Sequence, residues 1–170
     1  MNFAKELASV LAETDFDPAA IAAALSRARV LFFIGNGGSA AIASHMANDF
    51  SKNGGKSALS FNDGASLTCL ANDFGYDQVF AHPLGKHLLS TDVLVAISSS
   101  GESKNILAGV NVARHKGANV ITLTGFEETN SLRRLGKKNV YVPSKDYGIV
   151  ETIHLGVLHA ALREMPNACR

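Results

Sequence analysis

Cysteine is scarce in this chain, where Cys69 and Cys169 are the only two among 170 residues. Their separation fits neither a metal-binding nor a redox motif, and so sparse a pair is typical of reduced structural thiols. The sequence therefore predicts no disulfide framework, and this cysteine usage favours a cytoplasmic location.

Long apolar runs are also lacking. None approaches the ~20 residues that a membrane-spanning helix needs. The opening segment, MNFAKELASVLAETDFD, is interrupted by Lys5, Glu6 and Glu13, which indicates an amphipathic helix rather than a secretory leader. We expect a soluble protein with no membrane partner.

Neither sign of charge is in excess. Sixteen Lys and Arg balance fifteen Asp and Glu to a net charge of +1, and the basic residues are scattered, which argues against a nucleic-acid partner. A small anionic ligand is still compatible, because a pocket can be electropositive without changing the total charge. Hydrophobic residues make up 46% of the chain, enough for a sizeable core at this length.

Short apolar runs alternate with longer helical patterns, which is the rhythm of an α/β protein. The apolar runs are continuous, as in parallel strands buried on both faces. Strands are predicted at 29–34, 57–61, 92–97, 119–124 and 139–143. Helices are predicted at 3–13, 18–28, 38–52, 65–72, 103–116 and 149–164. Asp17 before Pro18 fits a helix N-cap, and Gly117 fits a helix C-cap.

This order predicts a doubly wound, Rossmann-like or flavodoxin-like parallel sheet of five strands with right-handed crossovers. We interpret residues 1–170 as one domain that begins with a short helical segment, about 1–28. In such sheets a ligand binds beyond the carboxyl ends of the strands, where loops lead into helix N-termini.

A glycine-rich loop, GNGGSAA at 35–41, follows the first predicted strand. Its glycines allow backbone N–H groups to approach a ligand, and the next helix presents the positive end of its dipole. Asn36, Gly37 and Gly38 are the expected contacts. The loop lacks the last glycine of G-x-G-x-x-G, and no G-K-[ST] follows, which disfavours dinucleotide and P-loop sites.

A serine-rich loop follows the third predicted strand. Ser98, Ser99 and Ser100 end that strand, and Ser103 falls at the N-cap of the next helix. Hydroxyls and backbone donors at a helix start can hold a phosphate with little formal charge. The simpler explanation is that one serine caps the helix and the others are ordinary polar loop residues. Four serines beside a glycine loop nevertheless favour a phosphate-binding site.

Four ionisable side chains form a second group. His45 and Asp49 stand at i, i+4 on one helix, and Glu151 and His159 share a side of the last helix. His154 points away from His159. The last helix is otherwise apolar, so it belongs to the core or to a subunit interface. The four groups suit a zinc site or a metal-free acid/base site, and their spacing leaves both open.

Five stretches resemble, in order and spacing, the phosphoheptose isomerases of the sugar isomerase (SIS) domain superfamily. They are GNGGSAAIASHMANDF, LANDFGYDQVF, ISSSGESKNI, ANVITLTGF and ETIHLGVLH. The likeness runs from about Val30 to Leu162. It implies a three-layer α/β/α sandwich and a homotetramer with active sites between subunits. It also implies isomerisation of sedoheptulose 7-phosphate to D-glycero-D-manno-heptose 7-phosphate, an early step toward bacterial heptose glycans such as lipopolysaccharide.

The resemblance also assigns roles to residues. It implies a zinc ion as well, which some members of the family bind. The implied zinc ligands are His45, Asp49, Glu151 and His159. Asp49 and His159 fall on the catalytic pair, with Glu151 as the alternative base. The implied sugar-phosphate contacts are Asn36, Gly37, Gly38, Ser39, Asn72, Asp73, Ser98, Ser99, Ser100, Ser103 and Glu151.

Three features depart from the family pattern. The family usually has Glu at the position of Asp49 and Gln at the position of Glu151, and its segment before the glycine loop is longer. The two substitutions either compensate, with Glu151 acting as base or ligand, or they indicate another substrate or lost activity.

The hypothesis that follows is aldose–ketose isomerisation through an enediol. Asp49 would move a proton between two neighbouring carbons, and His159 would move a proton between the oxygens bonded to those carbons. Two alternatives stay open. One is a non-enzymatic relative that binds the replication initiator DnaA, and the other is a sugar-phosphate sensor. The complete serine loop and the presence of His159 favour the enzyme.

Overall fold

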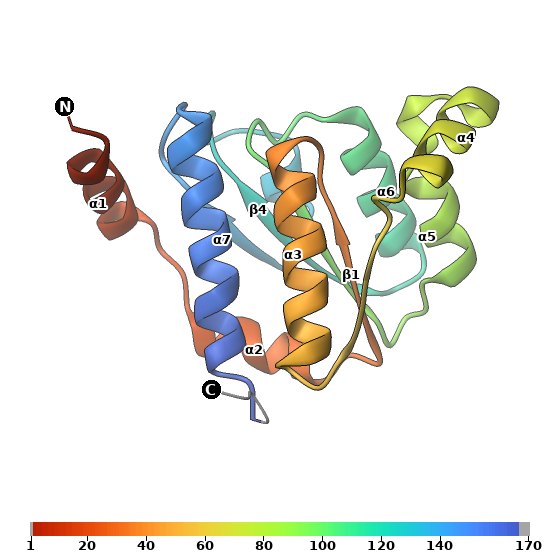
Figure 1. Cartoon of the computed structure of the whole chain (residues 1–170), viewed down its shortest axis with the longest axis horizontal. Coiled ribbons are helices and arrows are strands. Elements are labelled where there is room, and N and C mark those ends of the chain that lie inside the picture. The colour runs from red at the N-terminus through yellow and green to blue at the C-terminus, as the bar shows by residue number, and fades with distance from the viewer. Residues whose placement is uncertain (1, 167–170) are drawn as a thin grey trace.

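The computed structural model describes residues 2–166, which form a five-stranded parallel sheet between two layers of helices (Figure 1). The strand order is β2-β1-β3-β4-β5, and every pair of neighbours is parallel. The strands are β1 Val30–Ile34, β2 Ser57–Ser60, β3 Val93–Ser98, β4 Asn119–Thr124 and β5 Lys138–Tyr141. The predicted doubly wound α/β/α architecture is confirmed. Cys169 lies outside the described residues.

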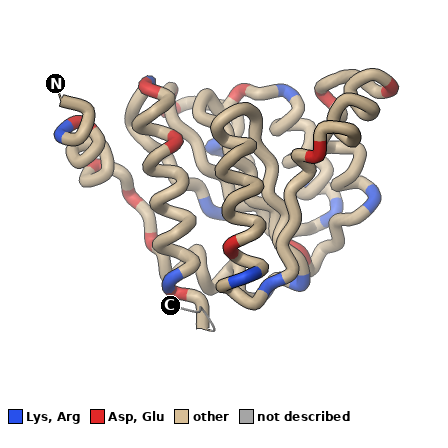
Figure 2. The backbone as a smooth tube through the Cα atoms, viewed as in Figure 1, with Lys and Arg blue, Asp and Glu red and all other residues tan. Residues whose placement is uncertain are grey.

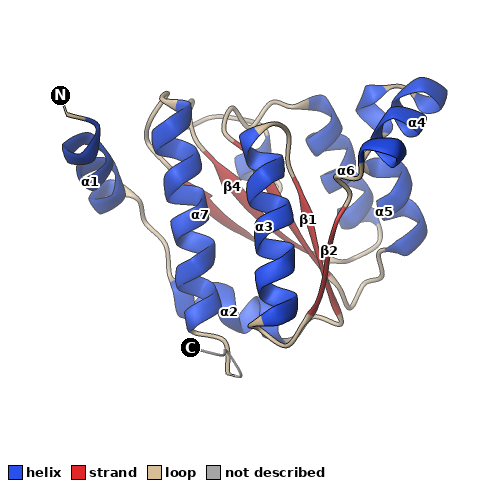
Figure 3. Ribbon diagram, viewed as in Figure 1, coloured by secondary structure: helices blue, strands red, loops and turns tan. Residues whose placement is uncertain are grey.

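The helices cover the two faces of the sheet, with α2, α3 and α7 on one face and α5 and α6 on the other (Figure 3). Helix α1 packs against α7 at one side of the molecule. The α-helices are α1 Phe3–Glu13, α2 Pro18–Ser26, α3 Gly38–Lys52, α4 Gly64–Phe74, α5 Ala81–His87, α6 Lys104–His115 and α7 Tyr147–Arg163. Two 3-10 helices, η1 Tyr76–Gln78 and η2 Leu132–Arg134, complete the described elements.

Alternate side chains of the central strands supply two cores. In β1, Leu31 and Phe33 join the cluster under α2, α3 and α7. Phe32 and Ile34 join the cluster under α5 and α6. Successive strand residues point to opposite faces, so a strand covered on both sides is apolar throughout, as the sequence predicted. Helix α7 contributes eight buried residues, which confirms its place in the core.

Two predictions about single elements were wrong. The predicted helices did not include 81–87, a segment that contains the poor helix formers Pro83 and Gly85. Helix α5 forms there since Leu84 is buried against the second core. Strand β2 was expected to be buried on both faces, but α3 covers only one face and Leu59 is 49% exposed. Strand β2 is an edge strand beyond the reach of α5 and α6.

The two predicted helix caps agree with the structure. The Asp17 carboxylate accepts a hydrogen bond from the backbone N–H of Ala20 at 3.0 Å, with Pro18 in the first turn. Gly117 follows the end of α6 in the left-handed conformation, with φ of 75°. Charged residues of both signs are distributed around the molecule (Figure 2). Within residues 2–166, no helix combines the length and apolar character needed to cross a bilayer.

Candidate active site

The glycine loop and the serine loop lie side by side because β1 and β3 are neighbours in the sheet. β1 leads through Gly35–Gly37 into α3, and β3 leads through 99–103 into α6. Between them is a pocket of about 130 Å³. Its lining contains seven of the predicted sugar-phosphate contacts, which are Asn36, Ser39, Ser98, Ser99, Ser100, Ser103 and Glu151. Ile97 and Tyr147 complete the lining, and the sequence had not singled out either residue.

The serine loop is folded around its own hydroxyls. The Oγ atoms of Ser98 and Ser103 lie 3.2 Å apart, and the backbone N–H of Gly101 donates to Ser98 Oγ at 3.2 Å. Ser99 differs, because its Oγ is buried and has no hydrogen-bond partner among the described residues. A buried hydroxyl without a partner is costly. Ser99 also lines the pocket, which makes its hydroxyl a candidate partner for a ligand bound there.

A reciprocal amide pair joins the two loops. Asn36 donates from Nδ2 to Asn105 Oδ1 at 2.9 Å, and Asn105 donates from Nδ2 to Asn36 Oδ1 at 2.9 Å. The hydroxyl of Tyr76 also donates to Asn36 Oδ1, at 3.1 Å. Asn105 is 2% exposed, and sequence reasoning missed it. The available signal was an amide inside a helix, where Asn is a poor former unless it has a partner.

The segment after β4 supports the serine loop from behind. The backbone N–H of Gly125 donates to Ser99 O at 2.9 Å, and that of Leu132 donates to Gly101 O at 3.0 Å. Asn130 is buried beneath Gly101, and its Nδ2 donates to the carbonyls of Gly125 and Glu127 at 3.2 and 2.7 Å. The loop conformation therefore depends on residues 125–132.

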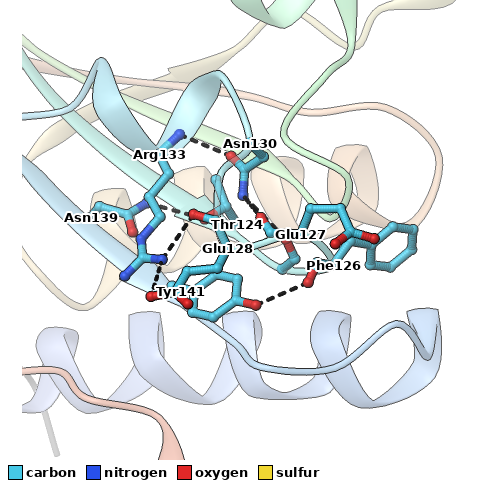
Figure 4. A network of polar contacts seen from close by, with 9 residues as sticks. Thr124, Phe126, Glu127, Glu128, Asn130, Arg133, Asn139 and Tyr141 are labelled. Carbon is cyan, nitrogen blue, oxygen red and sulfur yellow. Dashed lines mark hydrogen bonds and ion pairs between the residues drawn. The ribbon is translucent and has the colours of Figure 1, made fainter.

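A polar network in turn fixes this supporting segment (Figure 4). Asn130 Oδ1 accepts from the backbone N–H of Arg133 at 2.9 Å. Tyr141 donates its hydroxyl hydrogen to Phe126 O at 2.9 Å, and the Arg133 guanidinium lies 4.4 Å from the centre of the Tyr141 ring. Phe126 has a φ of 56°, an uncommon conformation for a bulky residue. The bond from Tyr141 holds the carbonyl of this residue in place.

Three of the four predicted acid/base residues meet between α3 and α7. His45, Asp49 and His159 each offer a ligand atom, and these atoms lie within 4.8 Å of one another. The two Nε2 atoms of His45 and His159 are 3.3 Å apart. Asp49 Oδ2 is 3.4 Å from His45 Nε2 and 3.8 Å from His159 Nδ1. Two nitrogens and one carboxylate oxygen at this spacing match the three-ligand sets of catalytic zinc sites.

Glu151 is in the serine-lined pocket instead of this trio. Its carboxylate lies against Gly38, where a Cβ atom would come within 2.1 Å of Oε2. Glycine at position 38 thus leaves the space that Glu151 occupies. Desolvation by burial raises the pKa of Glu151 above its usual value, because a buried carboxylate favours its neutral form.

Asn72 and Asp73 lie outside the pocket lining. Both are exposed on α4, where Asn72 Nδ2 donates to Asp73 Oδ1 at 2.9 Å. Asp73 Oδ2 also lies 3.5 Å from Cys69 Sγ, and this hydrogen bond raises the pKa of the thiol. Within the described chain, neither residue meets the serine loop, so their predicted contact with sugar phosphate stays a prediction.

His154 faces the sheet, away from His159, as its position in the helix predicted. The ring is fully buried, and its Nε2 is 3.1 Å from Thr124 O. Its Nδ1 has no partner in the part of the chain that the structure describes. Burial lowers the pKa of His154 to about 4, so the imidazole is neutral near pH 7.

Comparison with known proteins places this geometry in context. The SIS domain family model matches residues 12–125. The phosphoheptose isomerase of Helicobacter pylori is 35% identical over 135 residues, which are 76% of this chain and 70% of the relative. That of a Bradyrhizobium species is 36% identical over 159 residues, 89% of this chain and 79% of the relative. The structure of the phosphoheptose isomerase from Neisseria gonorrhoeae superposes with a TM-score of 0.80 at 30% identity, covering 92% of this chain and 88% of that one.

Proposed function

Because the chain belongs to the SIS domain family and, within it, to the phosphoheptose isomerases, we propose that it interconverts sedoheptulose 7-phosphate and D-glycero-D-manno-heptose 7-phosphate. The observation that carries this proposal is the pocket lined by all four serines of the serine loop. The two helices that line this pocket, α3 and α7, also carry the His45, Asp49 and His159 trio.

The spacing along α3 supports a substrate with its phosphate remote from the reacting carbons. Ser39 lines the pocket and His45 belongs to the trio, and six residues of helix separate them by ~9 Å along the axis. A heptose 7-phosphate carries its phosphate and its carbonyl at opposite ends. Phosphate binding at the serine loop would thus hold C1 and C2 beside the trio, using remote binding to orient the reaction.

In this proposal the proton transfers belong to Asp49 and His159. Starting from the ketose, Asp49 takes a proton from C1 while His159 donates one to the carbonyl oxygen on C2, which forms the enediol. His159 then takes the proton from the oxygen on C1, and Asp49 returns its proton to C2. The position of Asp49 beside both imidazoles supports its role as base over Glu151, which lies in the pocket.

The trio also fits a metal ion. His45, Asp49 and His159 would hold zinc through two nitrogens and one oxygen. When bound, the ion would supply Lewis-acid polarisation of the substrate oxygens. Glu151, which the resemblance also implies as a ligand, is outside this group.

The test is an isomerase assay with sedoheptulose 7-phosphate, run with and without a chelator, together with NMR detection of solvent deuterium entering C1 or C2. We expect turnover and deuterium incorporation. Ligand binding without incorporation would indicate a sensor and contradict the proposal. His159→Ala should abolish turnover while sugar phosphate still binds, whereas Ser98→Ala with Ser100→Ala should mainly weaken binding. Near wild-type turnover in His159→Ala would refute the assigned roles.

We also propose a cytoplasmic homotetramer with active sites between subunits, as the resemblance implies. Large apolar side chains exposed on the described chain support association of copies, among them Phe3, Leu59 and Phe74, each about half exposed. Light scattering at assay concentrations measures the assembly. A monomer that is fully active would contradict shared sites.

A further inference from the structure

A second pocket lies at the opposite end of the sheet from the serine loop. It is bounded by the end of α6 and by the segment that leads into β5, next to the first residues of β4 and β5. Its volume is about 370 Å³, against about 130 Å³ for the serine-lined pocket. Three of its lining residues are basic, namely Arg114, Arg134 and Lys137, and none is acidic.

The positive charges of this basic pocket are not neutralised by the chain around it. Residues 103–126 and 129–145 contain no Asp or Glu. In residues 2–166, the side chains of Arg114, Arg134 and Lys137 form no ion pair or hydrogen bond. Asp92 lies nearby at the start of β3, but its carboxylate is bound to Arg29 and to two backbone N–H groups. Arg133, by contrast, pairs with Glu128.

Ordinary structural reasons explain only part of this arrangement. Arg114 is in the last turn of α6, where a cation favours the helix dipole. That reason does not apply to Lys137, which precedes β5, and Arg134 ends the separate short helix η2. Three cations from two segments therefore line one hollow, and because all three residues are exposed, an anion can reach them from solvent.

We propose that the basic pocket binds a small anion that carries a diphosphate group, either free or as part of a nucleotide. One Arg guanidinium can donate two parallel hydrogen bonds to two oxygens of a phosphoryl group, and a Lys ammonium adds a localised positive charge. A single phosphate dianion would not balance three cations, whereas a diphosphate approaches that charge. Ala118, Val120 and Leu135 give the pocket an apolar wall that a nucleoside can contact. This inference is independent of the proposed isomerase activity.

The experiment titrates the full chain with pyrophosphate at low ionic strength, followed by calorimetry and amide NMR. Expected results are shifts at Gly117 and Gly136, and at least tenfold weaker binding in the double variant Arg134→Gln/Lys137→Gln. The matched control is Lys52→Gln/Arg163→Gln, which removes the same charge from the exposed ends of α3 and α7 and should bind as the wild type does. An unchanged midpoint of thermal denaturation in both variants verifies an intact fold.

Further measurements distinguish the basic pocket from the serine loop, and a nucleotide ligand from a free diphosphate. Ser98→Ala/Ser100→Ala should leave pyrophosphate binding at the basic pocket unchanged, because that pocket lies at the opposite end of the sheet from the serine loop. Tighter binding of ADP than of pyrophosphate identifies a nucleotide as the ligand, and equal binding identifies the free diphosphate. The proposal is overturned if orthophosphate binds as tightly as pyrophosphate. It is also overturned if both charge variants weaken binding equally, or if the NMR shifts are confined to the serine loop.

Discussion

Asn36 of the glycine loop and Asn105 at the start of α6, 69 residues apart, donate to each other through their side-chain amides at 2.9 Å in both directions. Each amide thereby satisfies its partner in a partly buried setting, and the glycine and serine loops become one rigid unit. Phosphate binding by hydroxyls and backbone donors depends on such preorganisation, because no formal charge compensates for poor geometry.

Asn105→Ala should therefore loosen the pocket without touching the proton-transfer residues. It leaves the Nδ2 group of Asn36 without its acceptor, which costs about 1–3 kcal/mol of folding free energy. The KM for sugar phosphate should rise several-fold, with a smaller change in kcat. The matched control is Asn111→Ala, an exposed residue on the same helix, which should change neither. Equal effects of the two variants in denaturation and kinetics would contradict the coupling.

Zinc should stabilise the folded chain through the trio. A ligand present at about 100 times its Kd adds about 2.7 kcal/mol to the free energy of unfolding, which thermal denaturation with and without Zn²⁺ detects. His159→Ala should lose most of this gain. The control His115→Ala removes an exposed imidazole on α6 and should keep it. A zinc-induced shift that is the same in both variants would place the metal elsewhere.

Glu151→Gln should strengthen substrate binding. The carboxylate shares the pocket with the phosphate site, and like charges at short range repel by ~1 kcal/mol or more, so KM should fall several-fold while kcat is largely kept. Because burial raises the pKa of Glu151, the difference in affinity between wild type and variant should shrink as the pH falls through that pKa. A collapse of kcat in Glu151→Gln would instead assign the base to Glu151.

Gly101→Ala should disrupt the serine loop from behind. The new Cβ would lie 2.0 Å from Asn130 Oδ1, at a φ of +69° that favours glycine. A loss of about 2 kcal/mol or more in unfolding free energy is expected, with a raised KM. Gly156→Ala in α7 is the matched control because it meets open space, and in a helix it should stabilise by up to about 1 kcal/mol. Unimpaired substrate binding in Gly101→Ala would contradict the support described for this loop.

His154 should make stability fall as the medium becomes acidic. Above about pH 6.5 this side chain is neutral in both the folded and unfolded states. Between pH 6.5 and about 4, His154 is protonated in the unfolded chain but stays neutral in the folded one. Stability attributable to this residue therefore declines with falling pH, by roughly 3 kcal/mol in all. In urea denaturation from pH 4 to 7, His154→Gln should reduce the slope and His115→Gln should not. Equal slopes in both variants would contradict this assignment.

Local signals were sufficient for most elements of the fold. The helix at 38–52 and the strand at 119–124 were predicted with the bounds that the structure shows, because strong periodicity and glycine-bounded ends coincide there. Helix α5 was missed because it forms through burial of Leu84 in spite of Pro83 and Gly85. The exposure of Leu59 depends on how far α5 and α6 extend over the sheet, which no local pattern encodes.

The site was predictable as two loops and a group of four ionisable residues, but not as a connected whole, and only three of the four meet. Eight residues of helix separate Glu151 from His159 by ~12 Å, so a shared side of α7 does not place both in one cluster. Tyr76 and Asn105 became visible only through Asn36, their partner from another loop. Asn130 belongs to the same class, since its role depends on the carbonyls around it.

The bonds from Gly125 and Leu132 to the serine loop set an order of events during synthesis. A ribosome-bound chain that ends at Ser103 has all four hydroxyls but nothing to shape them, because the residues that brace them have not yet been translated. The trio is completed later still, because His159 lies in α7. Catalytic competence therefore requires that α7 has been translated, which happens only after all five strands of the sheet have been made.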